Sequence, residues 1–504
     1  MTTLDAGHGS ASPPDPGLLD ARRIPLLLGI YFGLHLLIRL AISNTLALDE
    51  AEQVLLSQAF QWGYSGQPPL YAWIQHILFL VLGRNLFALA LLKNGLLLLA
   101  YLFFWLTARR LWPERGQLVA LAVLSWLLIP QIVWEAQRDL SHSVIVLTLA
   151  SASLYAVARA LARQTPRSSP GVLWYAAFGA LMGLGLLSKY NFVVFAGALN
   201  LALLSVPKGR ALLGNPRVLM ALLVMAVIAA PHLTWAADHW DVAVRSLGKV
   251  EASPGNNLFL GLGVLLLAGV SFLTPLWVAW LGFFPGLFRR ILAGRQGSLS
   301  LLVQRYLLVL VVGMALGVLA LGVGHVKERW MIPFLFVAPL HFFSGATARP
   351  LSRGRIRWFR RLAAAAAVAA LVVSGSRSLL GPTLGATTRL NYPFDAVAGT
   401  LEEAGLDREA ILAHNAWFGG NLLKRFPGVR AYVPGFVLPD PEDGAGVFVV
   451  WDAVRSEELP EEMRRELADR FGLDPGEEEP RYESFPYRFG AGREARVAFL
   501  RLGG

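Results

Sequence analysis

Two adjacent carboxylates, Asp49 and Glu50, directly follow the first long apolar segment of the chain. Charge at the edge of a membrane-length segment is costly and therefore points to function. A carboxylate here could act as a general base by taking the proton from a hydroxyl or amine group of a substrate. A structural interpretation stands beside it, because Asp49 and Glu52 have the spacing of a capping box. The pattern leaves both interpretations open.

A further carboxylate, Asp139, lies beside Arg138 at the start of another apolar segment. Asp139 could be the N-cap of a helix there, with Ser141 as an alternative cap. It could also be a second active-site acid that the neighbouring cation holds in place. The spacing alone favours the capping interpretation.

Several cations lie between apolar segments, where the phosphate of a membrane lipid would be presented. Arginine and lysine are the donors that bind phosphate. The ordinary alternatives are a lysine that snorkels between two short spans and a charged turn around Glu328. The candidates for phosphate binding are Lys189, Arg245, Lys249, Lys327 and Arg329.

Membrane-spanning helices must position these side chains. The chain has 504 residues, 55% of them hydrophobic and 16% charged, whereas a soluble protein has about 25% charged residues. The apolar residues form blocks of about 17–25, the length that crosses a bilayer. We predict eleven spans, at about 24–46, 86–107, 117–132, 140–161, 172–187, 191–206, 217–236, 258–288, 301–323, 331–347 and 362–380.

Basic residues orient these spans. One set of loops holds Arg22–Arg23, Arg109–Arg110, Arg289–Arg290 and the arginines of 353–361, and the opposite loops hold far fewer. Cytoplasmic loops are rich in Lys and Arg, so the first set is predicted to be cytoplasmic. Residues 1–23 are then a disordered cytoplasmic tail, 24–385 the transmembrane domain, and 386–504 an extracytoplasmic domain.

The regions outside the spans also have predictable structure. In the outer loop 47–85, segments 49–61 and 69–82 have the pattern of amphipathic helices lying in the membrane interface, with Trp62, Tyr64, Tyr71 and Trp73 as boundary aromatics. Residues 386–504 carry 21 acidic and 14 basic side chains, against 13 and 31 in residues 1–385. Strands at 446–451 and 495–502 and helices at 394–404 and 457–471 predict a small α/β domain there.

The composition excludes several kinds of site. The sequence has no cysteine, which rules out disulfides and thiol nucleophiles, and its nine histidines form no HxxxH or HxH pair. No metal or other cofactor is predicted. The isoelectric point of about 10.1 does not indicate nucleic-acid binding, because the basic residues flank membrane spans.

The first outer loop resembles a known family. Asp49-Glu50, the aromatic turn Trp62-Gly63-Tyr64 and Pro68-Pro69-Leu70 follow one another there. This order is similar to that of the bacterial relatives of the dolichyl-phosphate-mannose protein mannosyltransferases, which include lipid A aminoarabinose transferases and lipopolysaccharide-core galacturonosyltransferases. Weaker similarities are Arg138-Asp139, Gly185–Tyr190, and Lys327–Trp330 followed by Pro333; the resemblance covers about residues 24–345.

The resemblance implies an all-α polytopic membrane protein with the C-type glycosyltransferase fold. It implies transfer of a sugar from a polyprenyl-phosphate donor to a lipid, glycan or protein acceptor, with inversion, at the periplasmic face of a bacterial inner membrane. Asp49 would be the catalytic carboxylate, grouped with Glu50, and Asp139 the second cavity acid. Arg245, Lys327 or Arg329 would hold the donor phosphate. The substrate cavity would include Arg138, Tyr64, Gln67, Pro68 and Pro69, although relatives often have Lys or His where this chain has Gln67.

Two other classes of protein fit parts of the pattern. A lipid or solute transporter would also have many spans and buried charges, but it tends to show internal repeats, and none is visible here. A catalytically degenerate assembly subunit would keep the fold without the chemistry. The intact acids at 49 and 139 argue against that alternative, whereas Gln67 leaves it open.

Overall fold

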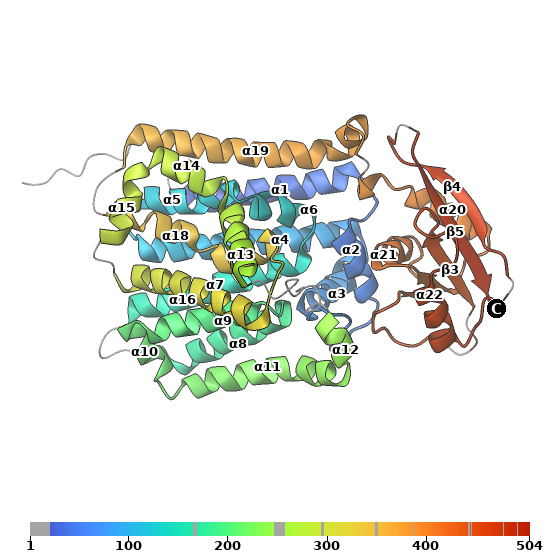
Figure 1. Ribbon diagram of the computed structural model, residues 1–504, viewed down its shortest axis with the longest axis horizontal. Coiled ribbons are helices and arrows are strands. Elements are labelled where there is room, and N and C mark those ends of the chain that lie inside the picture. The colour runs from blue at the N-terminus through green and yellow to red at the C-terminus, as the bar shows by residue number, and fades with distance from the viewer. Residues whose placement is uncertain are drawn as a thin grey trace, which may run out of the picture.

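The computed structural model describes residues 21–164, 169–245, 258–293, 297–347, 351–386, 388–441, 444, 446–476, 478–490 and 492–503. The predicted tail, apart from its last three residues, and the candidate Lys249 lie outside these ranges. Figure 1 shows a helical bundle at one end of the molecule and a small sheet at the other.

The bundle contains most of the helices, and their residues are predominantly Leu, Ala and Val. The helices are α1 (Ile24–Ile42), α4 (Leu86–Leu111), α5 (Gly116–Ser125), α6 (Ala136–Arg138), α7 (Ser141–Arg163), α8 (Val172–Ser188), α9 (Phe192–Leu204), α10 (Pro207–Leu213), α11 (Val218–Asp238), α13 (Leu258–Leu273), α14 (Leu276–Phe283), α15 (Pro285–Ala293), α16 (Ser298–Leu321), α17 (Ile332–Leu335), α18 (Ala338–Phe342) and α19 (Arg353–Thr383).

The described residues include six helices that are long and apolar enough to cross a membrane, and up to nine spans if each of three bent pairs is one span. This confirms a multi-pass membrane protein. The other two of the eleven predicted spans are shorter or broken. One is α8, with 17 residues. The other, 331–347, is divided into α17 and α18, each with a proline at its start, because proline cannot donate the helical hydrogen bond.

The loop between α1 and α4 forms two further helices, α2 (Leu48–Leu56) and α3 (Leu70–Leu82). Six of the nine residues of α2 are buried. A short helix, α12 (Trp240–Ala243), follows α11.

The C-terminal part is a small α/β unit. Its five-stranded sheet has the order β2-β1-β3-β5-β4, in which β1 pairs in parallel with β2 and β3 while β5 pairs antiparallel with β3 and β4. The predicted strands 446–451 and 495–502 correspond to β3 and β5. The elements are α20 (Phe394–Glu403), β1 (Ala410–Ala413), α21 (Ala416–Arg425), β2 (Ala431–Tyr432), β3 (Val447–Asp452), α22 (Glu461–Glu466), β4 (Arg481–Pro486) and β5 (Glu494–Leu502).

The C-terminal unit shares its hydrophobic core with the first loop. Ala51, Val54 and Leu55 of α2 belong to the same buried cluster as Phe418 of α21 and the interior of the sheet. The apolar face that the spacing of α2 predicts therefore packs against protein. This arrangement matters for the site, because α2 carries Asp49 and Glu50.

Candidate active site

Asp49 lies in the first turn of α2, but it does not cap that helix. Ala47 precedes the helix, and Oε2 of Glu50 accepts a hydrogen bond from the Ala47 backbone N–H at 2.8 Å. Asp49 Oδ2 instead accepts a hydrogen bond from the backbone N–H of Ser141 at 2.7 Å. Ser141 is the first residue of α7, whose N-terminus attracts negative charge. Glu50 therefore takes the local capping role, and Asp49 is anchored to a distant helix.

An irregular stretch of backbone brings Asp139 to the same place. A π-helix, η3 (Gln131–Glu135), precedes α6, and the helices on either side of Pro130 differ in direction by 72°. Leu140, between Asp139 and α7, has the left-handed backbone conformation, with φ of 70°. Such a conformation is costly for a branched residue and is often found at functional sites.

Asp139 is paired with the residue before it, since Arg138 Nε lies 3.1 Å from Asp139 Oδ2. Helix α7 begins after Leu140 and has no side-chain cap, so the N-cap interpretation of Asp139 is wrong. Burial raises the pKa of Asp139, and the negative charge of Asp49 raises it further, against the opposing effects of Lys93 and Arg138. Asp49 and Asp139 thus form an interacting pair of carboxylates.

Glu50 is engaged in a buried ion pair. Arg39 of α1 donates to both carboxylate oxygens, from Nε at 2.8 Å and from Nη2 at 2.6 Å. Burial alone would raise the pKa of Glu50, but Arg39, together with the Ala47 N–H, lowers it to about 2. A carboxylate held in this way is a weak base, so its position favours a structural role over the catalytic one.

The Glu50 pair gives a testable pH dependence. The pKa is lower in the folded protein than in the unfolded chain, so its contribution, roughly 3 kcal/mol for this shift, is present above pH 4.5 and is lost as the pH falls towards 2. We expect the melting temperature of the purified protein to fall more steeply over this range than that of Glu50→Gln. Identical acid sensitivity of the two proteins would contradict this assignment.

Two more side chains reach the first turn of α7. Lys189, which follows α8, donates from Nζ to Ser143 Oγ at 2.8 Å. Tyr71 of α3 is 1% exposed, and its hydroxyl lies near the side chain of Ser141. The candidate cation Lys189 therefore lies close to the Asp49 anchor. The sequence pattern indicated Tyr71 only as a boundary aromatic.

The other predicted phosphate ligands lie elsewhere in the loops. Arg245 donates from Nη1 to the carbonyl of Gly435 in the C-terminal unit at 2.9 Å. Lys327 directly precedes the short helix η6 (Glu328–Met331), and Arg329 lies within it and is exposed. The described contacts do not place these three cations beside Asp49.

The aromatic-Gly-Tyr turn is fixed from two sides. Tyr64 is buried, and its hydroxyl donates to Ala59 O at 2.9 Å. A β-carbon on Gly63 would lie 2.1 Å from the Trp235 ring of α11, so only glycine fits. His232, also of α11, bonds to Trp62 O at 2.8 Å and to the Tyr190 hydroxyl at 3.1 Å.

The turn leads into the second helix of the loop. Pro68 and Pro69 are buried, and Pro69 directly precedes α3. Gln67 is half-buried, and its backbone N–H bonds to Ser65 Oγ at 3.4 Å. These contacts give the turn and its prolines a positioning role for α3.

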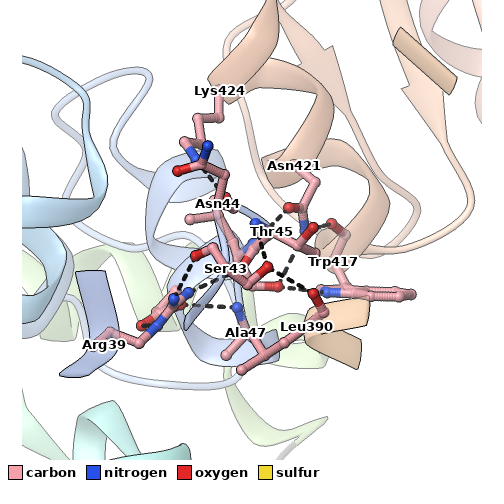
Figure 2. A network of polar contacts seen from close by, with 11 residues as sticks. Arg39, Ser43, Asn44, Thr45, Ala47, Leu390, Trp417, Asn421 and Lys424 are labelled. Atoms are coloured by element: carbon pink, nitrogen blue, oxygen red, sulfur yellow. Dashed lines mark hydrogen bonds and ion pairs between the residues drawn. The ribbon is translucent and has the colours of Figure 1, made fainter. Parts of the chain in front are cut away.

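The C-terminal unit holds the segment between α1 and α2 (Figure 2). Asn421 accepts the Leu46 N–H at 2.7 Å, and Trp417 Nε1 donates to Leu46 O at 2.8 Å. Ser43 Oγ and Thr45 Oγ1 donate to the carbonyls of Leu390 and Tyr392, respectively. Lys424 Nζ donates to the Asn44 carbonyl. The orientation of the helix that bears Asp49 therefore depends on a region about 370 residues later.

The described ranges contain no group of three or more His, Cys, Asp or Glu side chains that could hold a metal ion.

Comparison with known proteins identifies the family. Residues 66–235 match the family described as Dolichyl-phosphate-mannose-protein mannosyltransferase. The lipopolysaccharide core galacturonosyltransferase RgtB of Rhizobium johnstonii is 35% identical over 94% of this chain and 96% of its own length. The chain belongs to this family of membrane glycosyltransferases. The lipopolysaccharide core galacturonosyltransferase RgtA of the same organism is 32% identical over a stretch that covers 84% of this chain and 86% of RgtA.

Solved structures agree on the fold. The structure of ArnT from Cupriavidus metallidurans bound to undecaprenyl phosphate matches this chain with a TM-score of 0.59 and 13% identity. The match covers 95% of this chain and 98% of the ArnT chain. The apo form has a TM-score of 0.58. These structures confirm the predicted fold, and the similarity to RgtB confirms the predicted family.

Proposed function

We propose that the transferase moves galacturonic acid from a polyprenyl-phosphate donor to a lipid or glycan acceptor of the lipopolysaccharide type. The observation that carries the proposal is the carboxylate pair at the N-terminus of α7, where Asp49 is anchored by the Ser141 N–H and lies close enough to Asp139 to raise its pKa. The similarity to RgtB over 94% of the chain supports the choice of sugar. The ArnT neighbour with bound undecaprenyl phosphate supports the class of donor.

The proposed reaction is a direct displacement with inversion. The acceptor hydroxyl oxygen attacks the anomeric carbon, and the bond from that carbon to the phosphate oxygen breaks. Asp49 accepts the hydroxyl proton as general base. The lipid phosphate leaves with the electron pair, and nearby cations stabilise its charge. The ion pair of Asp139 and Arg138 lies in the turn before α7, next to the helix end that anchors Asp49.

The membrane orientation follows from charge. The segments 109–110, 289–290 and 353–361 hold clustered arginines and would face the cytoplasm. The first loop and the C-terminal unit would then lie on the opposite, periplasmic side of a bacterial inner membrane. A donor attached to a polyprenyl lipid suits this location, because it needs no cytoplasmic nucleotide.

Replacing the cations proposed to bind the donor phosphate with neutral residues should weaken use of the donor. Lys189 follows α8 and donates to Ser143 in the first turn of α7. We expect Lys189→Gln to lower kcat/KM for the donor about 10- to 100-fold, as loss of a charged hydrogen bond would. Smaller losses are expected for Lys327→Gln and Arg329→Gln, and none for Arg357→Gln, an exposed arginine near the other end of the bundle. Steady-state kinetics with varied donor measures this. An unchanged donor dependence in Lys189→Gln would move the phosphate site to Arg245 or Lys327.

The function itself is tested by transfer from defined donors. Purified transferase in lipid nanodiscs is given polyprenyl-phosphate galacturonic acid, galactose, mannose or aminoarabinose, labelled in the sugar, with a lipopolysaccharide acceptor. We expect label from galacturonic acid to appear on the acceptor with inverted configuration. Label transferred only from another sugar would reject the proposed donor. If the folded protein transfers no sugar from any of these donors, the proposed glycosyltransferase function is rejected.

A further inference from the structure

A small polar pocket lies near the carboxylate pair, and Glu50 and Arg138, the sequence neighbours of that pair, help to line it. The ends of α1, α4, α6 and α19 line it, and its enclosed volume is about 30 Å³ within a wider opening. The enclosed part has room for one small polar group rather than a whole sugar ring. Four of the side chains that line it are cationic, and one, Glu50, is acidic. Buried charges at membrane depth indicate function.

Only two of the four cations form ion pairs with a carboxylate in the described residues. Arg39 is neutralised by Glu50, and Arg138 is paired with Asp139. Lys93 of α4 is 4% exposed, and its Nζ has no hydrogen-bond partner in the described part of the chain. Nε of Arg377, on α19, likewise lacks a partner there, although its guanidinium lies 5.9 Å from the Trp134 ring. Lys93 and Arg377 therefore have no direct ion-pair partner among the described residues, although Lys93 lies close enough to Glu50 and Asp139 to interact with both carboxylates.

Neutral polar atoms around the pocket are also unsatisfied. Among the described residues, His35 Nε2, Asn94 Oδ1 and Gln137 Nε2 are buried and have no hydrogen-bond partner. A buried polar group without a partner is costly. The set contains both donors and an acceptor, since Asn94 Oδ1 can only accept. A ligand that satisfies it must offer hydrogen-bond donors as well as negative charge.

We propose that this pocket, centred on Lys93 and Arg377, binds the carboxylate of an acidic sugar substrate. The carboxylate would compensate the two cations, and hydroxyl groups of the same ring would serve Asn94 and Gln137. An ionised carboxylate and an ionised phosphate both offer only acceptors, so the ring hydroxyls must serve Asn94 Oδ1 in either case. The enclosed volume of about 30 Å³ favours the smaller carboxylate. The Trp134 side chain adds an apolar ring at the edge of the pocket, a surface on which a sugar can lie.

The location links the pocket to the reaction. Glu50 lines the pocket, and its neighbour in sequence is Asp49; Arg138 lines it as well, and it is bonded to Asp139. A sugar whose carboxylate occupies the pocket would thus have its ring beside the proposed base. This inference rests on the proposed function and extends it, because it assigns residues that would distinguish a uronic acid from the corresponding neutral hexose.

The test compares a carboxylated donor with its neutral counterpart. The substrates are polyprenyl-phosphate galacturonic acid and polyprenyl-phosphate galactose, and both transfer and equilibrium binding are measured for the wild type, Lys93→Gln and Arg377→Gln. We expect each variant to lose at least about tenfold on the carboxylated donor and less than about threefold on the neutral one. Arg357→Gln, on the same helix as Arg377 but near its other end, should change neither.

A second experiment shows whether the pocket binds a carboxylate of the donor or of the acceptor. The same proteins are assayed with a lipopolysaccharide acceptor and with that acceptor after reduction of its carboxyl groups. A loss in Lys93→Gln that disappears only with the reduced acceptor assigns the pocket to an acceptor carboxylate. Equal losses with all four substrates, or none, overturn the proposal. Selective, Lys93-dependent binding of the carboxylated lipid without transfer would support the pocket while rejecting the proposed function. Absence of both selective binding and selective transfer in the wild type would overturn both.

Discussion

Asp49→Asn is expected to lower the rate of sugar transfer by about 10²- to 10⁴-fold, the contribution of a well-placed general base. The substitution keeps the shape of the side chain, and the amide oxygen can still accept the Ser141 N–H that Asp49 Oδ2 accepts at 2.7 Å. The anchor to α7 is therefore preserved while the basicity is lost. Transfer of labelled galacturonic acid under single-turnover conditions measures the effect.

The control for this variant is Asp407→Asn, which removes a carboxylate that is 88% exposed in the C-terminal unit. It should transfer at the wild-type rate. Both proteins should retain the wild-type melting temperature and donor binding. A folded Asp49→Asn protein with full activity would remove Asp49 as the base and leave Asp139 as the next candidate.

Gly420→Ala should reduce transfer about 100-fold through a change far from Asp49 in sequence. A β-carbon at Gly420 of α21 would lie 1.9 Å from the backbone oxygen of Ala51 in α2. Backbone cannot move aside as a side chain can, so α2 must shift away from the C-terminal unit by an ångström or more. A displacement of about 1 Å in a catalytic group can cost 10²-fold in rate.

The matched control is Gly399→Ala in α20, where a β-carbon meets no atom within 4 Å. Alanine favours a helix over glycine by about 1 kcal/mol, so neither substitution should harm the helix that contains it. We expect Gly399→Ala to be fully active, and hydrogen exchange in α2 to rise only in Gly420→Ala. Normal activity of Gly420→Ala would show that the docking of the C-terminal unit does not position Asp49.

These two predictions express one property of the molecule. The helix that carries the proposed base is held at one end by α7 and along its apolar face by the C-terminal unit. Such support on both sides keeps a catalytic group in a fixed geometry, which is what transition-state stabilisation requires. We therefore expect the C-terminal unit to influence activity through the position of α2.

The sequence by itself determined the elements that depend on near neighbours. Long apolar blocks predicted the helices of a multi-pass protein, and the short segments 446–451 and 495–502 predicted β3 and β5. The order Asp49-Glu50, Trp62-Gly63-Tyr64 and Pro68-Pro69 was enough to indicate the family, since these motifs are local.

The tertiary structure decided what each charged residue does. Asp49 and Glu50 are adjacent and chemically similar, but only contacts with distant segments separate them: Ser141 anchors Asp49, and Arg39 neutralises Glu50. Lys93 and Arg377 lie inside predicted spans, where a charge is costly, but the sequence does not show which side chains face them. Their meaning arises from helix packing, which brings α1, α4 and α19 together around one pocket. A pattern of near neighbours contains no information about such long-range pairs, and for this reason the site became visible only in the folded chain.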